Sequence, residues 1–511
     1  MSEIKELLGL LDDNIPDIPI RKDPDGILKE PKFVDEAKST LNEDQMKAFE
    51  GLIDFMLSNK KMITISGFAG TGKSYLISKF FSSLDNATIA ATAPTNKATK
   101  VLREMGVMGS DVTYKTIHKL LALKMQWMFP KKEEKWKPYQ KLVHIRGKMP
   151  MVQNYNILIV DEVSMLSDKL FFMIKDEVKF CNTKVIFLGD IAQIPPIKDK
   201  KDSLSIDDLD AIPLVERYRK EHNIGFYLLS TPMRQSSDSG ILRTANSIRN
   251  LRFKEIDTIE DRTNTNDTKF DIVDSDDFMK DIYEKFISNE FKNNSDYAKV
   301  ISWRNVTVHK FNSIIRTFIY ETNDLPFIMK NEKLIANSSI ANEEGPVFNT
   351  SDEFEVVDYE EDTYYYRIES DDKMLSIIDN NEDINIKSGI ALHYLDTQVR
   401  VPIALDGEPS YDYYEIHILL PESYESLKHA KRKAYQNKRW SDYAMLSERF
   451  AQVSYNYAIT AHKSQGSSYE NVYIIEDDID KNWEDLTRNR IKYTAVSRAS
   501  KQLRILSRRN V

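Results

Sequence analysis

The sequence has 511 residues, 41% hydrophobic and 30% charged, a length that fits about three domains with sizeable cores. The formal net charge of −9 excludes a chain that is basic throughout, although a local basic groove for nucleic acid is compatible with it. No run approaches the roughly 18 apolar residues of a membrane helix, and the start lacks the basic region of a signal peptide. The single cysteine, Cys181, excludes internal disulfides, and we expect a cytoplasmic protein.

The N-terminal stretch is expected to be an arm over residues 1–40, because residues 12–38 are rich in Pro and Asp and show no amphipathic period. The first helix should follow Asn42, which can form a capping box with Gln45. A cap alone explains Gln45. The residue also stands 22 positions before Gly67, where a helicase-type ATPase would carry an adenine-reading glutamine.

The stretch Gly67–Ser74, GFAGTGKS, follows the apolar run Met62–Ile65 and has the spacing of a phosphate-binding P-loop. Glycines at this spacing let successive backbone N–H groups point at phosphate oxygens. The Lys73 ammonium can reach the β- and γ-phosphates, and the Ser74 hydroxyl can ligate Mg²⁺ at a helix N-terminus. The expected nucleotide-binding set is Gly67, Gly70, Thr71, Gly72, Lys73 and Ser74.

Three further buried strands are expected to end in polar residues. They are Thr88–Ala93 before Thr95 and Asn96, Asn156–Val160 before Asp161 and Glu162, and Val185–Leu188 before Asp190 and Gln193. Polar loops after parallel strands share the ligand side of an open α/β sheet, so these groups should join the P-loop. Asp161 would hold Mg²⁺, Glu162 would orient and deprotonate the attacking water, and Gln193 would sense the γ-phosphate.

Residues 122–150 interrupt this alternation with aromatic and cationic side chains, among them Trp127, Phe129 and Trp136. Interleaved rings and cations suit base stacking and phosphate contact. A hairpin whose aromatics pack on their own domain explains the composition equally well.

A change of character follows at residues 330–420, where short alternating strands indicate a small antiparallel barrel. These strands are Phe354–Tyr359, Tyr364–Glu369, Ser376–Asp379, Ile390–Tyr394, Gln398–Val401 and Tyr413–Leu420. Residues 426–450 form a basic helical pattern, more often a solvated face than a binding patch. A second α/β sheet is expected from Lys299–Ser302, Ser454–Ile459, Val472–Ile475 and Gln502–Ile505.

Taken in order, the motifs resemble those of a superfamily 1 DNA helicase of the Dda/RecD-like branch. They are GFAGTGKS, APTNKA, TIHKLL, IVDEVSM, FLGDIAQIPP, PMRQ, ITAHKSQGSSYENV and YTAVSRA. The resemblance implies an α/β fold of two tandem RecA-like P-loop domains with parallel sheets, a β-hairpin pin and an SH3-like β-barrel insertion. The implied bounds are 41–121 and 151–230 for domain 1A, 122–150 for the pin 1B, 231–329 and 451–511 for domain 2A, and 330–450 for the barrel with its helical extension, 2B.

The same resemblance implies roles for single residues. Gln45 would read adenine, and Arg234 and Arg498 would be arginine fingers from the second domain. Gln465 and Gly466 would couple the phosphate site to DNA. The implied DNA contacts are Thr95, Asn96, Thr116, His118, Lys463 and an aromatic of the pin, Trp127, Phe129 or Trp136, for which the resemblance favours function over packing.

The implied function is an ATP- and Mg²⁺-dependent DNA helicase that moves 5′→3′ on single-stranded DNA and separates forked duplex. It would act as a monomer, in the bacterial host cytoplasm if phage-encoded, with single-strand-binding or replisome proteins as candidate partners. Two alternatives stay open. One is a RecD-like motor subunit of a nuclease complex, and the other is an ATP-gated factor that remodels protein–DNA complexes without processive unwinding.

Overall fold

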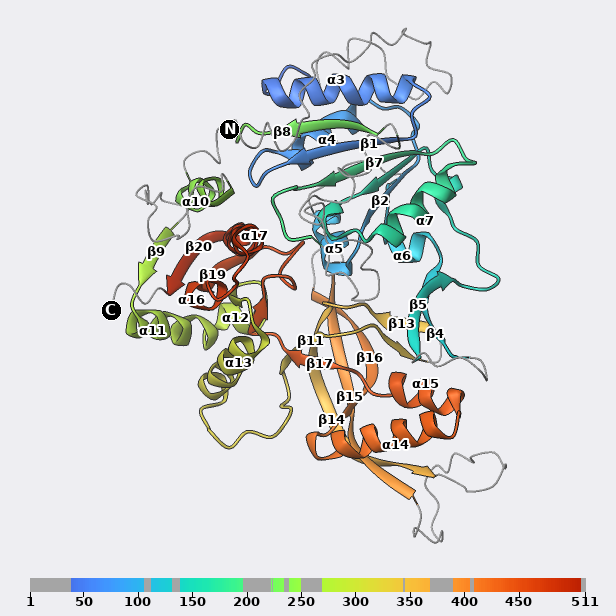
Figure 1. Cartoon of the computed structure of the whole chain (residues 1–511). Coiled ribbons are helices and arrows are strands. Elements are labelled where there is room, and N and C mark those ends of the chain that lie inside the picture. Colours follow the sequence, from blue (N-terminus) through green and yellow to red (C-terminus); the bar gives the residue numbers. More distant parts are fainter. Residues whose placement is uncertain are drawn as a thin grey trace. The chain divides into compact units, whose positions relative to one another are not determined.

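The structure is a computed structural model that describes residues 38–104, 112–130, 138–195, 222, 224–233, 239–249, 269–342, 345–367, 389–404 and 409–506. The chain divides into two compact units (Figure 1). The first unit takes the described parts of 1–123, 144–311 and 458–511, and the second takes those of 124–143 and 312–457. No helix in these ranges is both long enough and apolar enough to cross a membrane.

A six-stranded parallel sheet, the first sheet, has the order β3-β2-β6-β7-β1-β8. Its strands are β1 Met62–Gly67, β2 Ile89–Ala93, β3 Val112–Thr116, β6 Ile157–Val160, β7 Lys184–Gly189 and β8 Gly225–Leu229. Every residue of β1 is buried. The predicted strands β2, β6 and β7 are confirmed, and their carboxyl ends share the edge at which β1 ends. Strand β8 was not predicted.

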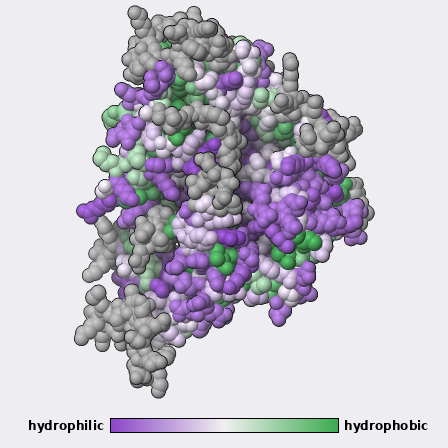
Figure 2. Space-filling view, turned by 180° about the vertical axis from the view of Figure 1, so that it is seen from behind, coloured by the Kyte–Doolittle hydropathy of each residue, from purple (hydrophilic) through white to green (hydrophobic). Residues whose placement is uncertain are grey.

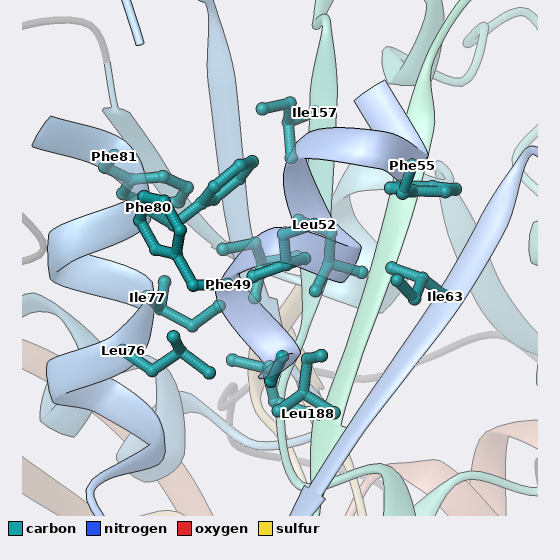
Figure 3. Packing of buried hydrophobic residues seen from close by; sticks show 14 of the residues in the cluster. Phe49, Leu52, Phe55, Ile63, Leu76, Ile77, Phe80, Phe81, Ile157 and Leu188 are labelled. Atoms are coloured by element: carbon teal, nitrogen blue, oxygen red, sulfur yellow. The ribbon is translucent and has the colours of Figure 1, made fainter. Parts of the chain in front are cut away.

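The helices of this part are α3 Glu43–Leu57, α4 Lys73–Ser82, α5 Asn96–Glu104, α6 Ile117–Leu120 and α7 Asp168–Val178, with 3₁₀ turns η1 Val152–Asn154 and η2 Val163–Met165. Figure 3 shows the core where α3 and α4 pack beside the sheet. Phe49 and Phe80 meet edge to face, with ring centroids 6.4 Å apart. The amphipathic pattern of α3 therefore buries its apolar side against the strands.

Gly51 explains how α3 can lie so close to β8. A Cβ at Gly51 would stand 2.1 Å from the ring of Tyr227 on β8, so no larger residue fits. Glycine inside a helix costs about 1 kcal/mol relative to alanine. Packing of the Tyr227 ring offsets this cost.

A second parallel sheet, also in the first unit, has the order β18-β10-β19-β20-β9. Its strands are β9 Lys269–Val273, β10 Ala298–Ser302, β18 Ala458–Thr460, β19 Tyr469–Ile475 and β20 Ala499–Leu506. The helices in the same chain segments are α10 Gly240–Arg249, α11 Ser275–Phe286, α12 Asn289–Asn293, α13 Asn305–Tyr320, α16 Glu476–Ile479 and α17 Asp485–Val496. Two parallel sheets were predicted, and this fold class is confirmed.

One predicted strand of the second sheet is wrong as a single element. The stretch Ser454–Ile459 breaks into β17, Val453–Tyr455, and β18. Strand β17 pairs with β11, Lys333–Ala336, whereas β18 pairs with β10. The backbone N–H of Asn456 donates to Lys333 O, and the two residues between the strands, Asn456 and Tyr457, include no Gly or Pro that would mark the break.

The second unit holds a five-stranded antiparallel sheet in the order β16-β15-β14-β11-β17. Its longer strands are β14 Glu353–Arg367, β15 Gly389–Ala404 and β16 Pro409–Leu419, and two short pairs are β12 Ile340–Asn342 with β13 Gly345–Phe348 and β4 Leu123–Met128 with β5 Tyr139–His144. Strands β14 and β15 each merge two predicted short strands. The predicted strand Ser376–Asp379 lies outside the described residues.

The basic segment 426–450 was expected to be one helix and is instead two, α14 Tyr424–Gln436 and α15 Trp440–Glu448, after the 3₁₀ turn η5 Pro421–Ser423. The break coincides with Lys438, whose φ of +56° ends a right-handed helix. Ala430, Ala434 and Leu446 bury the apolar side of both helices against β14 and β15. On the face in Figure 2 the described surface is mostly hydrophilic, with small separate hydrophobic areas.

A buried ion pair beside the second sheet gives a stability prediction. Lys492 of α17 is 1% exposed and lies 2.7 Å from Glu476 Oε1 and 2.6 Å from Asp480 Oδ1. Lys492→Met would leave buried Glu476 without its partner cation, and we expect a loss of about 3–5 kcal/mol.

Thermal unfolding measures this loss as a clear drop in Tm. The matched control is Lys501→Met, which removes an exposed pair with Glu470 and should leave Tm nearly unchanged. Equal Tm values for the two variants would contradict the prediction.

Candidate functional site

The loop between β1 and α4 holds the residues predicted to bind phosphate. Gly70 and Gly72 have φ values of +76° and +75°, in the left-handed region that favours glycine. A Cβ at Gly72 would lie 2.4 Å from Met233 Sδ and 2.5 Å from Gln45 Nε2. The glycines that the motif requires are thus also required by the local packing.

Lys73 and Ser74 are the first residues of α4, so both stand at a helix N-terminus. The Lys73 ammonium donates to Gly67 O at 2.6 Å and therefore lies within the loop itself. Thr71 is 1% exposed, and its hydroxyl donates to Phe68 O at 2.8 Å. The loop is consequently closed by its own side chains while its positive helix end faces outward.

Gln45 forms the helix cap that the sequence predicted and also contacts the P-loop. Its Oε1 accepts from Asn42 N at 3.1 Å, and its N–H donates to Asn42 Oδ1 at 2.9 Å, which is the predicted capping box. Its Nε2 donates to Thr71 O at 3.0 Å. The amide thus joins the start of α3 to the P-loop, and adenine reading stays a prediction.

Asp44, next to Gln45, forms a contact that the sequence did not reveal. Its Oδ2 accepts from the backbone N–H and the hydroxyl of both Ser230 and Thr231, at 2.8–3.0 Å. Burial alone would raise the pKa of Asp44, but these hydrogen bonds outweigh it and lower the pKa. The carboxylate fastens α3 to the end of β8, beside the P-loop strand.

Asp161 and Glu162 follow β6 as predicted. Enclosure by protein, together with the charge of Glu162, raises the pKa of Asp161, even though Glu162 N donates to Asp161 Oδ1 at 2.8 Å. Glu162 has a φ of +51°, which is unusual for a residue with a long side chain. Its buried Oε2 has no hydrogen-bond partner among the described residues. Two carboxylates with unmet acceptor capacity suit a hard cation and a bound water.

The segment 190–194 after β7 is bonded to the second sheet at several points. Tyr493 of α17 donates its hydroxyl hydrogen to Asp190 Oδ2, and the Tyr493 hydroxyl oxygen accepts from Ala69 N of the P-loop at 2.9 Å. Burial and then the charge of Asp190 raise the pKa of Tyr493, so the phenol stays protonated. One hydroxyl therefore links the P-loop, the end of β7 and α17.

Ile194 makes the next two links. Its N–H donates to Thr494 Oγ1 at 3.3 Å, and its carbonyl accepts from Gln465 Nε2 at 2.7 Å. Gln193, the residue before Ile194, is 5% exposed, and its Oε1 accepts from Ser164 Oγ at 3.4 Å. Gln465, predicted from a distant part of the sequence, therefore bonds the residue next to Gln193.

Gly466 brings the second sheet into contact with Glu162. Its φ is +70°, and a Cβ there would lie 3.0 Å from Ala98 Cβ and 3.7 Å from Glu162 Cγ. The predicted neighbours Gln465 and Gly466 are thus both placed against elements of the first sheet.

Of the two predicted arginine fingers, Arg498 lies within the described residues and Arg234 does not. Arg498 donates to Thr494 O, Ser467 O and Ser497 Oγ at 2.9–3.1 Å, all within elements of its own sheet. Arg234 lies outside the described residues. Met233, directly before it, donates its N–H to Gly70 O at 2.9 Å. The finger role stays a prediction for both arginines.

The predicted DNA contacts of the first sheet serve as helix starts. Thr95 Oγ1 accepts from Ala98 N at 3.2 Å and Thr116 Oγ1 from Lys119 N at 3.3 Å, and the two residues are 8% and 1% exposed. Asn96 begins α5. Burial lowers the pKa of His118 and of Lys463. These placements fit structural roles, and contact with DNA stays a prediction.

Two predicted aromatics of the pin pack on α15 within the second unit. The rings of Trp127 and Phe129 are nearly parallel, 6.3 Å apart, and Phe129 stacks on Trp440 at 5.6 Å. Trp127 also meets Tyr443 edge-on at 5.5 Å. Packing, the alternative that composition left open, accounts for both rings. Trp136 lies outside the described residues, and base stacking stays a prediction.

Comparison with known proteins decides the family. Residues 40–262 match the AAA domain family, and residues 455–506 match the UvrD-like helicase C-terminal domain. The ATP-dependent DNA helicase dda of Enterobacteria phage T4 is 25% identical over 466 residues, covering 85% of this chain and 92% of that protein. This chain is homologous to the Pif1/Dda/RecD-like helicases.

Other relatives of this Dda/RecD-like helicase are similar over most of its length. The uncharacterized protein R530 of Acanthamoeba polyphaga mimivirus is 26% identical and covers 90% of this chain and 99% of its own. The RecBCD enzyme subunit RecD of Buchnera aphidicola is 25% identical, over 88% of this chain and 71% of its own. In this helicase the AAA match spans all strands of the first sheet, and the C-terminal match spans β18, β19 and β20.

The Asp44 contact gives a pH-dependent prediction. A carboxyl whose folded pKa is lowered contributes stability above its unfolded pKa, and this contribution is lost as pH falls through the folded pKa. Asp44→Asn should therefore lower stability at pH 7 by about 1 kcal/mol, a screened value for a partly exposed group.

The difference in urea midpoint between Asp44→Asn and wild type should shrink as pH falls below the ordinary aspartate pKa of 3.8. Asp85→Asn, at an exposed position, serves as the control and should match wild type throughout. A difference that does not change with pH would refute the electrostatic account.

Proposed function

We propose that this helicase uses ATP to move 5′→3′ along single-stranded DNA and to separate the strands of a forked duplex. The observation that carries the proposal is the direct bonding of second-sheet residues to the nucleotide site of the first sheet, above all Tyr493 to Ala69 and Asp190. A site built from two sheets can convert hydrolysis into relative movement. The relatives named ATP-dependent DNA helicase support the activity, and the family resemblance alone supports the direction.

The nucleotide would lie on the P-loop with its phosphates at the N-terminus of α4, held by Lys73 and the loop N–H groups. Ser74 and Asp161 would hold Mg²⁺, since hydroxyl and carboxylate oxygens are its preferred ligands. Bound there, Mg²⁺ supplies charge neutralisation at the β- and γ-phosphates. Glu162, with its unpartnered Oε2, would orient the attacking water. Gln193 would sense the γ-phosphate.

DNA would be coupled to this site through residues 463–466. Gln465 bonds Ile194 O and Gly466 lies against Glu162, so a shift of this segment by bound DNA would act on the catalytic residues. Thr95, Asn96, Thr116, His118 and Lys463 are the proposed strand contacts. These side chains would contact the phosphodiester backbone and not the base edges. Binding would therefore show little sequence preference.

Strand separation would depend on the pair β4 and β5 acting as a pin. The Trp127, Phe129 and Trp440 stack holds β4 against α15, and each such aromatic pair adds about 0.5–1.5 kcal/mol beyond area burial. A pin supported in this way resists bending when a duplex is driven against it.

The setting of this activity is also a proposal. The enzyme would work as a monomer in the cytoplasm, on single-stranded and forked DNA, with single-strand-binding or replisome proteins as partners. A RecD-like subunit would instead need partner chains to unwind, and a remodelling factor would displace bound proteins without unwinding.

The deciding experiment compares duplexes with a 5′ or a 3′ single-stranded tail, using the purified chain alone. We expect unwinding of the 5′-tailed duplex only. Lys73→Ala should abolish DNA-stimulated ATP hydrolysis and unwinding, because the phosphates lose their cation, while binding of single-stranded DNA persists.

Normal unwinding by Lys73→Ala would overturn the proposal, and unwinding from the 3′ tail would overturn its direction. Streptavidin displacement without any unwinding would favour the remodelling factor.

The pin support can be tested separately. Trp440→Ala should reduce fork unwinding about tenfold, since Phe129 loses the α15 ring on which it stacks, while single-strand-stimulated ATP hydrolysis stays near wild type. Tyr365→Ala, on an exposed part of β14, is the control and should unwind normally. A parallel loss of ATP hydrolysis and unwinding in Trp440→Ala would contradict a role confined to the pin. The tenfold figure corresponds to about 1.4 kcal/mol of lost support.

A further inference from the structure

Arg249, the last residue of α10, faces the P-loop. Its guanidinium carbon lies 3.4 Å from the centroid of the Phe68 ring. Its Nη1 donates to Asn246 Oδ1 at 3.1 Å, one turn earlier on the same helix. Among the described residues no other hydrogen bond of Arg249 is present, so most of its five N–H donors are available.

The surroundings of Arg249 belong to the nucleotide site. Burial lowers the pKa of Arg249, and the nearby Asp190 and Tyr493 only partly oppose this effect. The Tyr493 hydroxyl accepts from Ala69 N and donates to Asp190. Arg249 and Tyr493 therefore reach two successive P-loop residues, Phe68 and Ala69.

Arg249 and Tyr493 come from two helices that pack together, α10 and α17. Helix α10 packs on α17, and Ile241, Ala245 and Ile248 bury its apolar side. Arg249 and Tyr493 thus move with one rigid pair of helices. The guanidinium of Arg498, in contrast, donates to Thr494, Ser467 and Ser497, which all belong to the same part of the chain as the second sheet.

The stacking geometry leaves the guanidinium able to bind an anion. A guanidinium lying over an aromatic ring uses its flat face, while its N–H groups point outward in its own plane. That plane matches the oxygens of a phosphate, which a guanidinium binds through two parallel hydrogen bonds. The Phe68 ring would then fix the orientation of the Arg249 guanidinium plane.

We propose that Arg249 supplies a phosphate-binding cation to the nucleotide site from the second sheet, positioned by the Phe68 ring. The inference rests on the proposed ATP hydrolysis. Arg249 would contact the terminal phosphate and stabilise the charge that develops there as the bond to it breaks. Hydrolysis would then require α10 to lie against the P-loop.

The test is steady-state ATP hydrolysis with saturating single-stranded DNA. Arg249→Gln should lower kcat by about 100-fold or more with a much smaller change in KM, since removal of one donor to a transition-state charge has this size. Arg249→Lys keeps the charge without the planar fork and should recover part of the loss. Arg243→Gln, on the same helix, is the matched control and should keep wild-type kcat.

Binding of ADP with aluminium fluoride provides a second measurement that does not depend on turnover. Arg249→Gln should weaken this complex at least tenfold while leaving the affinity for ADP alone unchanged. Equal weakening of both complexes, or a wild-type kcat in Arg249→Gln, would overturn the inference. A wild-type chain that fails to unwind tailed duplex would instead count against the proposed function, and the aluminium fluoride comparison would still decide the role of Arg249.

Discussion

A single buried hydroxyl, that of Tyr493, holds together the parts of the nucleotide site. It accepts from the P-loop at Ala69 and donates to Asp190 at the end of β7. A hydrogen bond adds only about 1 kcal/mol net, but a buried polar group left without a partner costs about 1–3 kcal/mol. All three groups are therefore tied to one arrangement, because a shift of α17 that breaks one bond leaves several polar atoms unsatisfied.

The rest of the contact between the two sheets extends from this point. Thr494 follows Tyr493 in the chain and bonds Ile194, whose carbonyl accepts from Gln465. Gly466 then lies against Glu162. The segment after β7 is consequently bonded to Tyr493, Thr494 and Gln465, and the residue next to Gln465 lies against Glu162, the predicted catalytic glutamate. Such short connected paths allow a movement of one sheet to alter the geometry of the other.

The sequence predicted what local patterns determine. The P-loop, the strands β2, β6 and β7 and the polar residues after them were correct, because each is a short apolar run followed by a motif. Strands β8 and β9 were missed, since both lie at sheet edges and their residues are only partly buried. The stretch Ser454–Ile459 was misread because no Gly or Pro marks the break between its two strands.

Contacts between residues far apart in the chain could not be predicted from the sequence. Nothing in the motif around Tyr493 indicates that its hydroxyl meets Ala69, and Asp44 reads as an ordinary acidic residue in the first turn of a helix. The aromatics of the pin show the same limit. Composition could not separate stacking on a base from packing on Trp440, since both use the same rings.

The two halves of the Gln45 amide are each engaged, Oε1 by the start of α3 and Nε2 by Thr71 O. Recognition of adenine through this side chain would therefore exchange an existing bond for a new one of similar strength, about 1 kcal/mol. Selectivity for adenine over other bases would then be weak, because the free energy of a new hydrogen bond to the base is offset by the loss of the existing hydrogen bond of Gln45. Nucleotide selection would then depend mainly on the phosphates. A nucleoside triphosphate with another base would be hydrolysed nearly as well as ATP.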